Sequence, residues 1–287
     1  MKIRFIINPI SGTRKKQINV IRLIKLHLIY QYDICYTKKR GDATLLCKNA
    51  IEENINTIIA VGGDGTVNEC IKVLINTEIA LGVIPCGSGN GFATHIGMSQ
   101  NLKSAIKQLN SCQITSCDTC SINNHPFVNV AGIGFDAHIA NLFSNNRIRG
   151  LKTYIKLIFK ELSYNAKNYT IKYDNKEEKV KAYFIAFANT SLYGNNIHIS
   201  PNANINDGLM DLVIVKQFPK WRILLFLFKM ITKRIQNSKY VKIIKTKEVR
   251  ILAKDIITHI DGEPIKIKGE IHVITNTNNL KLFKPNA

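Results

Sequence analysis

Three glycine-rich segments contain residues whose types and spacing suit phosphate chemistry. They span residues 8–12 (Asn-Pro-Ile-Ser-Gly), 62–66 (Gly-Gly-Asp-Gly-Thr) and 85–91 (Pro-Cys-Gly-Ser-Gly-Asn-Gly), and each follows a short apolar run. Glycine lets the backbone approach a ligand closely, and free N–H groups at the start of a helix favour phosphate. Asp64 adds a carboxylate, which makes sense if Mg²⁺ is bound nearby. We therefore expect the three loops to converge on one polyphosphate.

These loops do not match the best-known nucleotide-binding patterns. The chain has no G-x-x-x-x-G-K-[ST] sequence, and no G-x-G-x-x-G sequence lies between a strand and a helix. A single glycine turn is more often just a turn. The interpretation as a site therefore depends on the set of three.

The elements that would position these loops alternate between strand and helix patterns over the first ~115 residues. Such alternation predicts βαβ units and a parallel sheet, whose ligands gather at the carboxyl ends of the strands. Beyond this point, closely spaced strands with Asn, Asp and Gly turns predict antiparallel sheets or a sandwich. Helical patterns near residues 151–162 and 220–235 interrupt the strands.

Composition narrows the class of protein. The 287 residues carry 40 Lys and Arg against 20 Asp and Glu, a net charge of +20, which favours an anionic partner. An apolar content of 45% excludes intrinsic disorder. Seven cysteines without a tight framework favour a reducing compartment, and the apolar run at the N-terminus is too short for a signal peptide. We expect a cytoplasmic protein, without a membrane span and without a nucleic-acid-binding motif.

The motifs together resemble the diacylglycerol kinase catalytic-domain family, which includes soluble bacterial lipid kinases and sphingosine kinases. The resemblance starts with the three glycine-rich loops and continues through residues 132–136 (Gly-Ile-Gly-Phe-Asp), 207–211 (Asp-Gly-Leu-Met-Asp) and 261–264 (Asp-Gly-Glu-Pro). It implies an α/β nucleotide-binding domain, related to NAD kinases and phosphofructokinases, and a second domain like an antiparallel β-sandwich. Combined with the change of pattern, it places the domains at residues 1–117 and 118–275, with residues 276–287 returning to the first.

The resemblance also implies an activity, the transfer of the γ-phosphoryl group of ATP to the hydroxyl of a diacylglycerol-like or sphingoid lipid, with Mg²⁺. Glu263 and Asp261 would be the catalytic residues, with Glu263 accepting the proton. The residues implied at the nucleotide site are Asn8, Pro9, Ile10, Ser11, Gly12, Thr37, Gly62, Gly63, Asp64, Gly65, Thr66, Val67, Asn68, Glu69 and Ser88. The lipid would be met at the inner face of the membrane, and a homodimer is compatible with the family.

Two further features concern metals. Several bacterial members hold a structural Mg²⁺ near a segment matching Asn204, Asp207 and Leu209, although an Asn-Asp-Gly turn explains these residues equally well. Many bacterial diacylglycerol kinases also carry Asp where this chain has Gly91. Loss of this carboxylate would weaken the network of residues linked to Mg²⁺. It also puts diacylglycerol itself in doubt as the substrate.

Other constellations leave alternatives open. Cys112, Cys117, Cys120 and His125 offer zinc-ligand types, but strand alternation favours structural thiols. The helical pattern around residues 221–233 is apolar and basic; it fits a helix packed on the second domain or one lying on an anionic membrane. A soluble-substrate kinase of the NAD kinase type, and a non-catalytic protein that binds nucleotide or lipid, remain alternative functions.

Overall fold

The computed structural model describes residues 1–12, 14–145, 150–252 and 256–286. It divides the chain into two units. Unit 1 comprises Met1–Cys117 with Asn278–Ala287, and unit 2 comprises Asp118–Thr277. The two units are described separately below.

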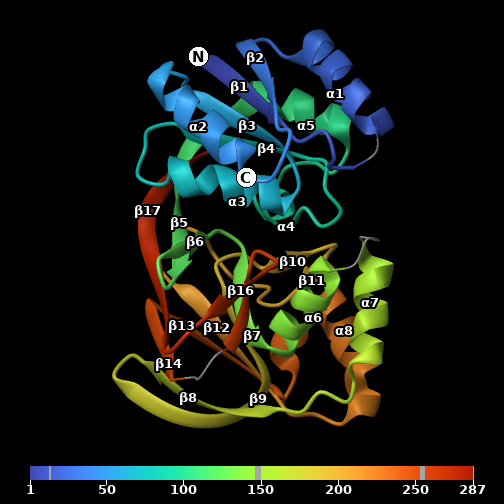
Figure 1. The fold of residues 1–287 in the computed structure, drawn as a ribbon, viewed down its shortest axis with the longest axis vertical. Helices are drawn as coiled ribbons and strands as arrows, with labels where there is room; N and C mark the ends of the chain where they lie inside the picture. Colours follow the sequence, from blue (N-terminus) through green and yellow to red (C-terminus); the bar gives the residue numbers. More distant parts are fainter. Residues whose placement is uncertain (13, 146–149, 253–255, 287) are drawn as a thin grey trace. The chain divides into compact units, whose positions relative to one another are not determined.

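Unit 1 alternates strands and helices along the chain, as the sequence predicts (Figure 1). Its elements are β1 (Lys2–Ile7), α1 (Arg14–His27), β2 (Gln31–Tyr36), α2 (Asp42–Glu52), β3 (Thr57–Gly62), α3 (Asp64–Leu74), β4 (Ala80–Pro85), α4 (Gly91–His95), α5 (Leu102–Gln108), a 3₁₀ turn (Leu109–Ser111) and the start of β5 (Cys112–Ile122). The end of β17 (Ile271–Pro285) completes the unit.

The sheet of unit 1 is parallel, with the strand order β2-β1-β3-β4-β17. Every residue of β3 and β4 is buried, which is the pattern of central strands covered on both faces. Strand β17 joins the edge through Leu282, which pairs with Leu81 of β4. The predicted α/β architecture is confirmed.

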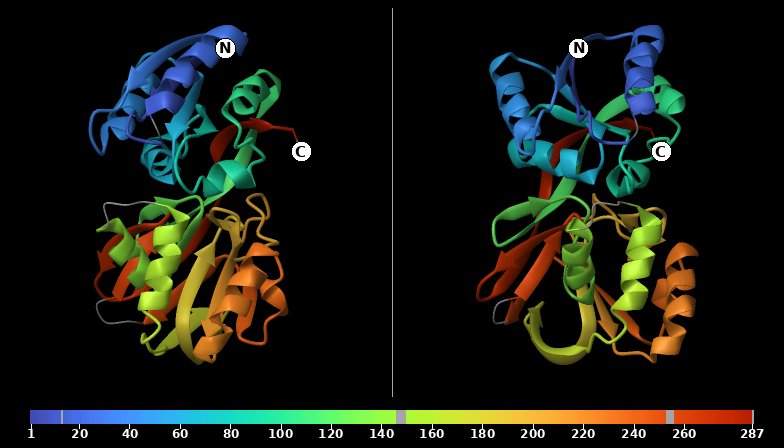
Figure 2. Two further views of the ribbon diagram at one scale, coloured as in Figure 1. Left: turned by 90° about the vertical axis from the view of Figure 1, so that its right-hand side faces the viewer. Right: turned by 45° about the vertical axis from the view of Figure 1, so that its right-hand side comes forward.

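Helices cover both faces of this sheet. Helix α1 packs beside α5, and α2 packs beside α3 across the strands from them (Figures 1 and 2). Strand β2 follows β1 in the sequence but lies on one side of it, while β3 lies on the other, so the strand order reverses between β1 and β3. Ligands of open parallel sheets bind at such a reversal, beyond the carboxyl ends of the strands. The loops after β1 and β3 therefore flank the expected ligand position.

Unit 2 consists mostly of antiparallel strands. After β5 its elements are β6 (His125–Phe127), β7 (Val130–Gly134), α6 (Phe135–Ser144), α7 (Leu151–Lys160), β8 (Lys167–Tyr173), β9 (Lys176–Ala188), β10 (Leu192–Gly194), β11 (Ile197–His198), β12 (Met210–Lys216), a 3₁₀ turn (Lys220–Arg222), α8 (Ile223–Ile231), a 3₁₀ turn (Ile235–Asn237), β13 (Val241–Thr246), β14 (Glu248–Leu252), β15 (Ile256–Ile260), β16 (Glu263–Ile267) and the start of β17. The pairs β7–β9, β8–β9, β9–β12, β12–β13 and β15–β16 are all antiparallel. The predicted antiparallel second domain is confirmed.

The strands of unit 2 separate two hydrophobic clusters. Along β12, Leu212 and Ile214 enter a cluster enclosed by strands, whereas Val213 and Val215 enter a cluster that includes side chains of α6 and α8. Side chains of a strand alternate between faces, so both faces must be apolar for a sheet buried on both sides. Figure 1 shows α6, α7 and α8 gathered on one side of these strands.

The helical pattern predicted for residues 220–235 gives only nine α-helical residues, in α8. The helix ends because Lys233 adopts a left-handed φ of 57°. The N–H of Arg234 then donates to the carbonyl of Lys229 at 2.8 Å, and the N–H of Lys233 to the carbonyl of Met230 at 3.4 Å. These two bonds form a Schellman motif, which stops a helix without glycine at some cost in backbone strain.

Four hairpins of unit 2 share one turn chemistry. Each has a two-residue loop with both central φ angles positive, the pattern of a type I′ turn. The loops are Asn123-Asn124, Asp174-Asn175, Asn195-Asn196 and Asp261-Gly262. Asn, Asp and Gly tolerate this conformation best, so the turn residues fix the register of the strands.

Candidate phosphate-binding loops and catalytic hairpin

The loops after β1 and β3 are joined by a side-chain hydrogen bond. Asn8 Nδ2 donates to Thr66 Oγ1 at 3.2 Å, while Asn8 Oδ1 accepts from the N–H of Ile10 at 3.1 Å. The second bond closes an Asx turn, which turns the chain away from the strand. Asn8 thereby fixes the first loop against the start of α3.

The loops after β3 and β4 approach each other backbone to backbone. A Cβ placed on Gly87 would lie 2.5 Å from the Cα of Gly63, so a side chain there would collide with the neighbouring loop. The carboxylate of Asp64 joins the same two loops: Oδ2 accepts from the N–H of Gly91 and Oδ1 from the N–H of Phe92, each at 3.1 Å. Asp64 therefore caps the first turn of α4, and Gly91 lies at that cap.

Glu69 and Thr37 connect a fourth loop, the one after β2. Glu69 Oε1 accepts from the N–H of Gly41 at 2.9 Å, and Oε2 accepts from the N–H of Ala43 at 3.1 Å. Thr37 is buried, and its N–H donates to the carbonyl of Ile7 at the end of β1. Both residues thus hold the loops in place through contacts with the backbone.

The structure brings most of the nucleotide-site residues expected from the sequence to one edge of the unit 1 sheet. Exposed residues of these loops include Pro9, Ile10, Gly12 and Ser88. Thr66, Val67 and Asn68 differ, because their side chains are buried in the first turns of α3. Of the other expected residues, Ser11 lies in the loop after β1, Gly62 ends β3, Gly63 precedes α3 and Gly65 lies in its first turn.

In unit 2, Glu263, the residue expected to accept the proton, directly follows a tight two-residue turn. Glu263 is the first residue of β16 and pairs with Ile260 across the Asp261-Gly262 turn. Asp261 Oδ1 accepts from the N–H groups of Asn129 at 2.9 Å and Val130 at 3.2 Å. The Asp261 side chain thus ties the turn to the segment leading into β7.

Asp136 is the last residue of the Gly-Ile-Gly-Phe-Asp motif at residues 132–136, and the motif alone indicated no role for it. Asp136 is buried at the first turn of α6, where its carboxylate contacts Tyr193 Oη at 3.0 Å and His259 Nε2 at 3.1 Å. Burial and the Asp136 charge raise the pKa of Tyr193, so the phenol stays protonated and donates. The sequence pattern did not indicate this contact, because Asp136, Tyr193 and His259 are far apart in the sequence.

A lysine from β13 contacts the segment expected to hold a structural Mg²⁺. Lys245 Nζ lies 2.7 Å from Asp207 Oδ2 and 3.3 Å from Oδ1 of the buried Asp211. Asp207 Oδ1 accepts from the N–H of Leu209 at 3.1 Å, and Asn204 Oδ1 from the N–H of Asn206 at 3.0 Å. A metal would have to displace the ammonium group, so the set does not fit Mg²⁺ in this arrangement. Burial lowers the pKa of Lys245, but the two carboxylates outweigh it and raise the pKa overall.

The cysteines considered for zinc are packed thiols. Cys112, Cys117 and Cys120 are buried, and burial raises the pKa of Cys112 and Cys120 to about 12. Among the described residues no cluster of three or more His, Cys, Asp or Glu side chains is arranged to hold a metal. Likewise, no helix of the described part of the chain is long and apolar enough to cross a bilayer.

Comparisons with known proteins agree with this architecture. The profile of the diacylglycerol kinase catalytic domain matches residues 2–122, and the profile of the YegS C-terminal NAD kinase beta sandwich-like domain matches residues 129–277. A diacylglycerol kinase structure from Bacillus anthracis superposes with a TM-score of 0.77 at 23% identity, covering 99% of this chain and 96% of that one. The fold is therefore that of the diacylglycerol kinases.

Sequence relatives carry related names. A probable lipid kinase YegS-like of Chromohalobacter salexigens is 28% identical over 79% of this chain and 76% of its own length. A diacylglycerol kinase of Staphylococcus aureus is 28% identical over 91% of this chain and 85% of its own length. The chain belongs to the diacylglycerol kinase family and is an enzyme, a kinase of the lipid kinase type.

Proposed function

We propose that this enzyme transfers the γ-phosphoryl group of ATP, bound as its magnesium complex, to the hydroxyl group of a diacylglycerol-like or sphingoid lipid. The observation that carries the proposal is the set of loops at the strand ends of unit 1, which are joined to one another by side-chain hydrogen bonds. It accompanies a chain that matches the family over nearly its whole length. We infer that the enzyme meets its lipid at the cytoplasmic face of the membrane.

The loops support nucleotide binding through backbone groups. Helix α3 begins at Asp64, so its first N–H groups face the end of β3, where an anion is stabilised. The Asp64 and Glu69 carboxylates accept bonds from neighbouring loops instead of pointing unpaired at the phosphates. Mg²⁺ bound to ATP would supply positive charge that offsets the negative charge of the phosphates during transfer.

Glu263 is the proposed general base. Transfer forms a bond between the lipid oxygen and the γ-phosphorus, breaks the bond to ADP and leaves a proton on the hydroxyl oxygen. The anchored Asp261 side chain precedes Glu263 in the same tight turn, so the backbone that carries the Glu263 carboxylate is fixed. That position supports a role in which Glu263 takes the proton.

The test is transfer of labelled γ-phosphate from ATP to a panel of lipids and to NAD, using the full chain and Glu263→Gln. We expect a labelled lipid with the native chain. Removing a positioned base costs about 10²–10⁴-fold in rate, so Glu263→Gln should label at least a hundred-fold less while binding ATP unchanged.

Three results would count against the proposal. Undiminished transfer by Glu263→Gln would overturn the assignment of the base. Labelling of NAD and of no lipid would favour a kinase of a soluble substrate. ATP binding with no transfer to any acceptor would remove the proposed activity.

A further inference from the structure

Helix α8 (Ile223–Ile231) is apolar on both its buried and its exposed face. Ile223, Phe226 and Met230 are buried in the cluster beneath the helix. On the other side, Leu224 is 65% exposed and Phe228 57% exposed. The exposed apolar side chains on and next to the helix are Trp221, Leu224, Leu225, Phe228 and Ile231. An apolar helix face left in water normally has a partner.

Basic residues surround this apolar face. Residues 220–240 contain six cations, Lys220, Arg222, Lys229, Lys233, Arg234 and Lys239, and no Asp or Glu. The indole ring of Trp221 lies under the guanidinium of Arg222, with 4.6 Å between the guanidinium carbon and the ring centroid. Apolar side chains with a basic rim are the composition of helices that lie in the interface of anionic membranes.

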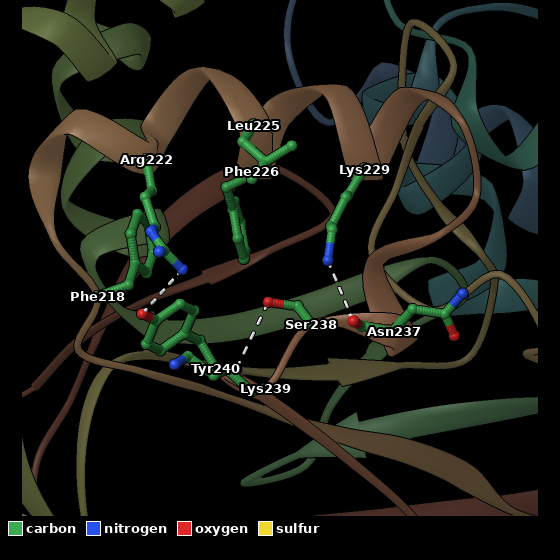
Figure 3. Close-up of a pocket in the computed structure, with 9 residues that line it drawn as sticks. All are labelled: Phe218, Arg222, Leu225, Phe226, Lys229, Asn237, Ser238, Lys239 and Tyr240. Atoms are coloured by element: carbon green, nitrogen blue, oxygen red, sulfur yellow. Dashed lines mark hydrogen bonds between the residues drawn. The ribbon is translucent and has the colours of Figure 1, made fainter.

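A pocket of about 280 Å³ opens beside the helix and is lined by three of these cations, Arg222, Lys229 and Lys239. Figure 3 shows Arg222, at the end of the 3₁₀ turn before α8, extending toward Tyr240, and Lys229 of α8 extending toward Asn237. No carboxylate is among its lining residues. The pocket therefore has the charge to hold an anionic group.

Among the lining residues, the cations of this pocket contact neutral groups only. Arg222 Nη1 donates to Tyr240 Oη at a long 3.3 Å, and Arg222 Nε has no hydrogen-bond partner among the described residues. Lys229 Nζ donates to the neutral carbonyl of Asn237 at 3.1 Å. No carboxylate neutralises these groups in the pocket, so an incoming phosphate would gain their full attraction.

We propose that α8 is a membrane-docking surface, with its exposed apolar side chains in the acyl boundary and the pocket holding the phosphate of an anionic phospholipid. A second copy of this chain is a poorer occupant, because a two-fold contact would bring the six cations of each copy together. Nucleic acid would match the positive charge, but its phosphate backbone offers no apolar surface to cover Leu224 and Phe228. The inference rests on the proposed function only in that a lipid kinase needs access to a bilayer.

The test is co-sedimentation with vesicles, in the absence of ATP. We expect the full chain to bind phosphatidylcholine vesicles containing phosphatidylglycerol at least ten-fold more tightly than pure phosphatidylcholine vesicles. The double variant Leu224→Gln/Phe228→Gln should lose at least ten-fold in affinity. Its matched control is Ile29→Gln/Leu45→Gln, which changes equally exposed apolar residues of unit 1 and should bind as the native chain does.

A second pair of variants isolates the charge. Lys229→Gln/Lys239→Gln should reduce the preference for phosphatidylglycerol, whereas Lys103→Gln/Lys107→Gln, on the exposed side of α5, should leave most of it. The helix variant should still phosphorylate a short-chain lipid dispersed in detergent. This separates failed docking from failed catalysis.

Several results would overturn the proposal. One is equal binding by the native chain and by Leu224→Gln/Phe228→Gln; another is no preference for the anionic vesicles. Dissociation of a dimer by the same double variant, with vesicle binding unchanged, would assign the face to a second copy instead.

Discussion

Asp64, Glu69 and Asp261 share one mode of action at the residue scale. Each carboxylate accepts at least two backbone N–H groups from a neighbouring loop. Such charge-assisted bonds are stronger than neutral ones, and they fix loops that have few apolar contacts of their own. In both units, a carboxylate thus holds the backbone of a neighbouring segment in place.

Asp261 offers a direct test of this distinction. Asp261→Ala removes the acceptor and places Ala at a φ of 49°, so we expect the free energy of unfolding to fall by about 2–4 kcal/mol. Asp261→Asn keeps an acceptor oxygen and a residue that tolerates this φ, so the loss should be about 1 kcal/mol. Urea denaturation measures both changes.

Kinase assays on Asp261→Ala and Asp261→Asn test whether the Asp261 carboxylate only positions the turn or takes part in the reaction. If Asp261 only positions the turn, Asp261→Asn keeps most of the kcat and Asp261→Ala loses kcat together with stability. Loss of kcat in Asp261→Asn at nearly native stability would instead give the carboxylate a part in the reaction.

At the element scale, strand β13 carries two lysines that pair with carboxylates, and only one of them contacts the segment expected to hold metal. Lys245 contacts Asp207 and Asp211, while Lys242 contacts Glu178 at 2.6 Å. The lysine ammonium of Lys245 supplies the positive charge that a Mg²⁺ ion would otherwise supply between the two aspartates.

We predict that the melting temperature of the native chain is the same with EDTA and with millimolar Mg²⁺. Lys245→Met leaves two carboxylates without their cation and should lower the free energy of unfolding by about 1–3 kcal/mol, between the values for exposed and buried pairs. Added Mg²⁺ should recover part of this loss. Lys242→Met is the matched control and should gain no dependence on Mg²⁺.

The measurement is thermal melting of the native chain, Lys245→Met and Lys242→Met, each with Mg²⁺ and with EDTA. A native chain that EDTA destabilises would mean that Mg²⁺ displaces Lys245 and occupies the segment, as the family resemblance implies.

On the scale of the whole molecule, β17 contributes residues to both units. Residues 271–274 pair with β14 in unit 2, and Leu282 pairs with β4 in unit 1. Leu280, Leu282 and Phe283 are buried in unit 1. Each buried apolar side chain of this size contributes about 1.5–3 kcal/mol, so the last ten residues supply a large part of the stability of unit 1.

We therefore expect Phe283→Ala to lower the stability of unit 1 by about 3–5 kcal/mol, the range for removing a buried phenylalanine. Hydrogen exchange read by mass spectrometry should show faster exchange in peptides from β3 and β4 and little change in β9 and β12. Lys284→Ala, at the next position, is the control and should change neither. Equal loss of protection in both sets of peptides would contradict this division of stability.

Features that depend on local chemistry could be predicted from the amino-acid sequence. Apolar runs ending at Asn8 and Gly62 predicted parallel strands, because the burial of consecutive apolar residues needs cover on both faces. Pairs such as Asp174-Asn175 predicted hairpins, because few residues tolerate positive φ. Motif order then identified the family, and the family profiles confirm it.

Contacts between side chains far apart in the sequence could not be predicted and became visible in the folded chain. Nothing in the spacing indicated that Lys245 would lie between Asp207 and Asp211, or that Asp136 would contact Tyr193 and His259. The same holds for α8: its pattern fitted both a buried helix and a membrane helix, and the fold buries one face while exposing the other. Periodicity states which residues share a face, but what covers that face depends on contacts between elements remote in the chain.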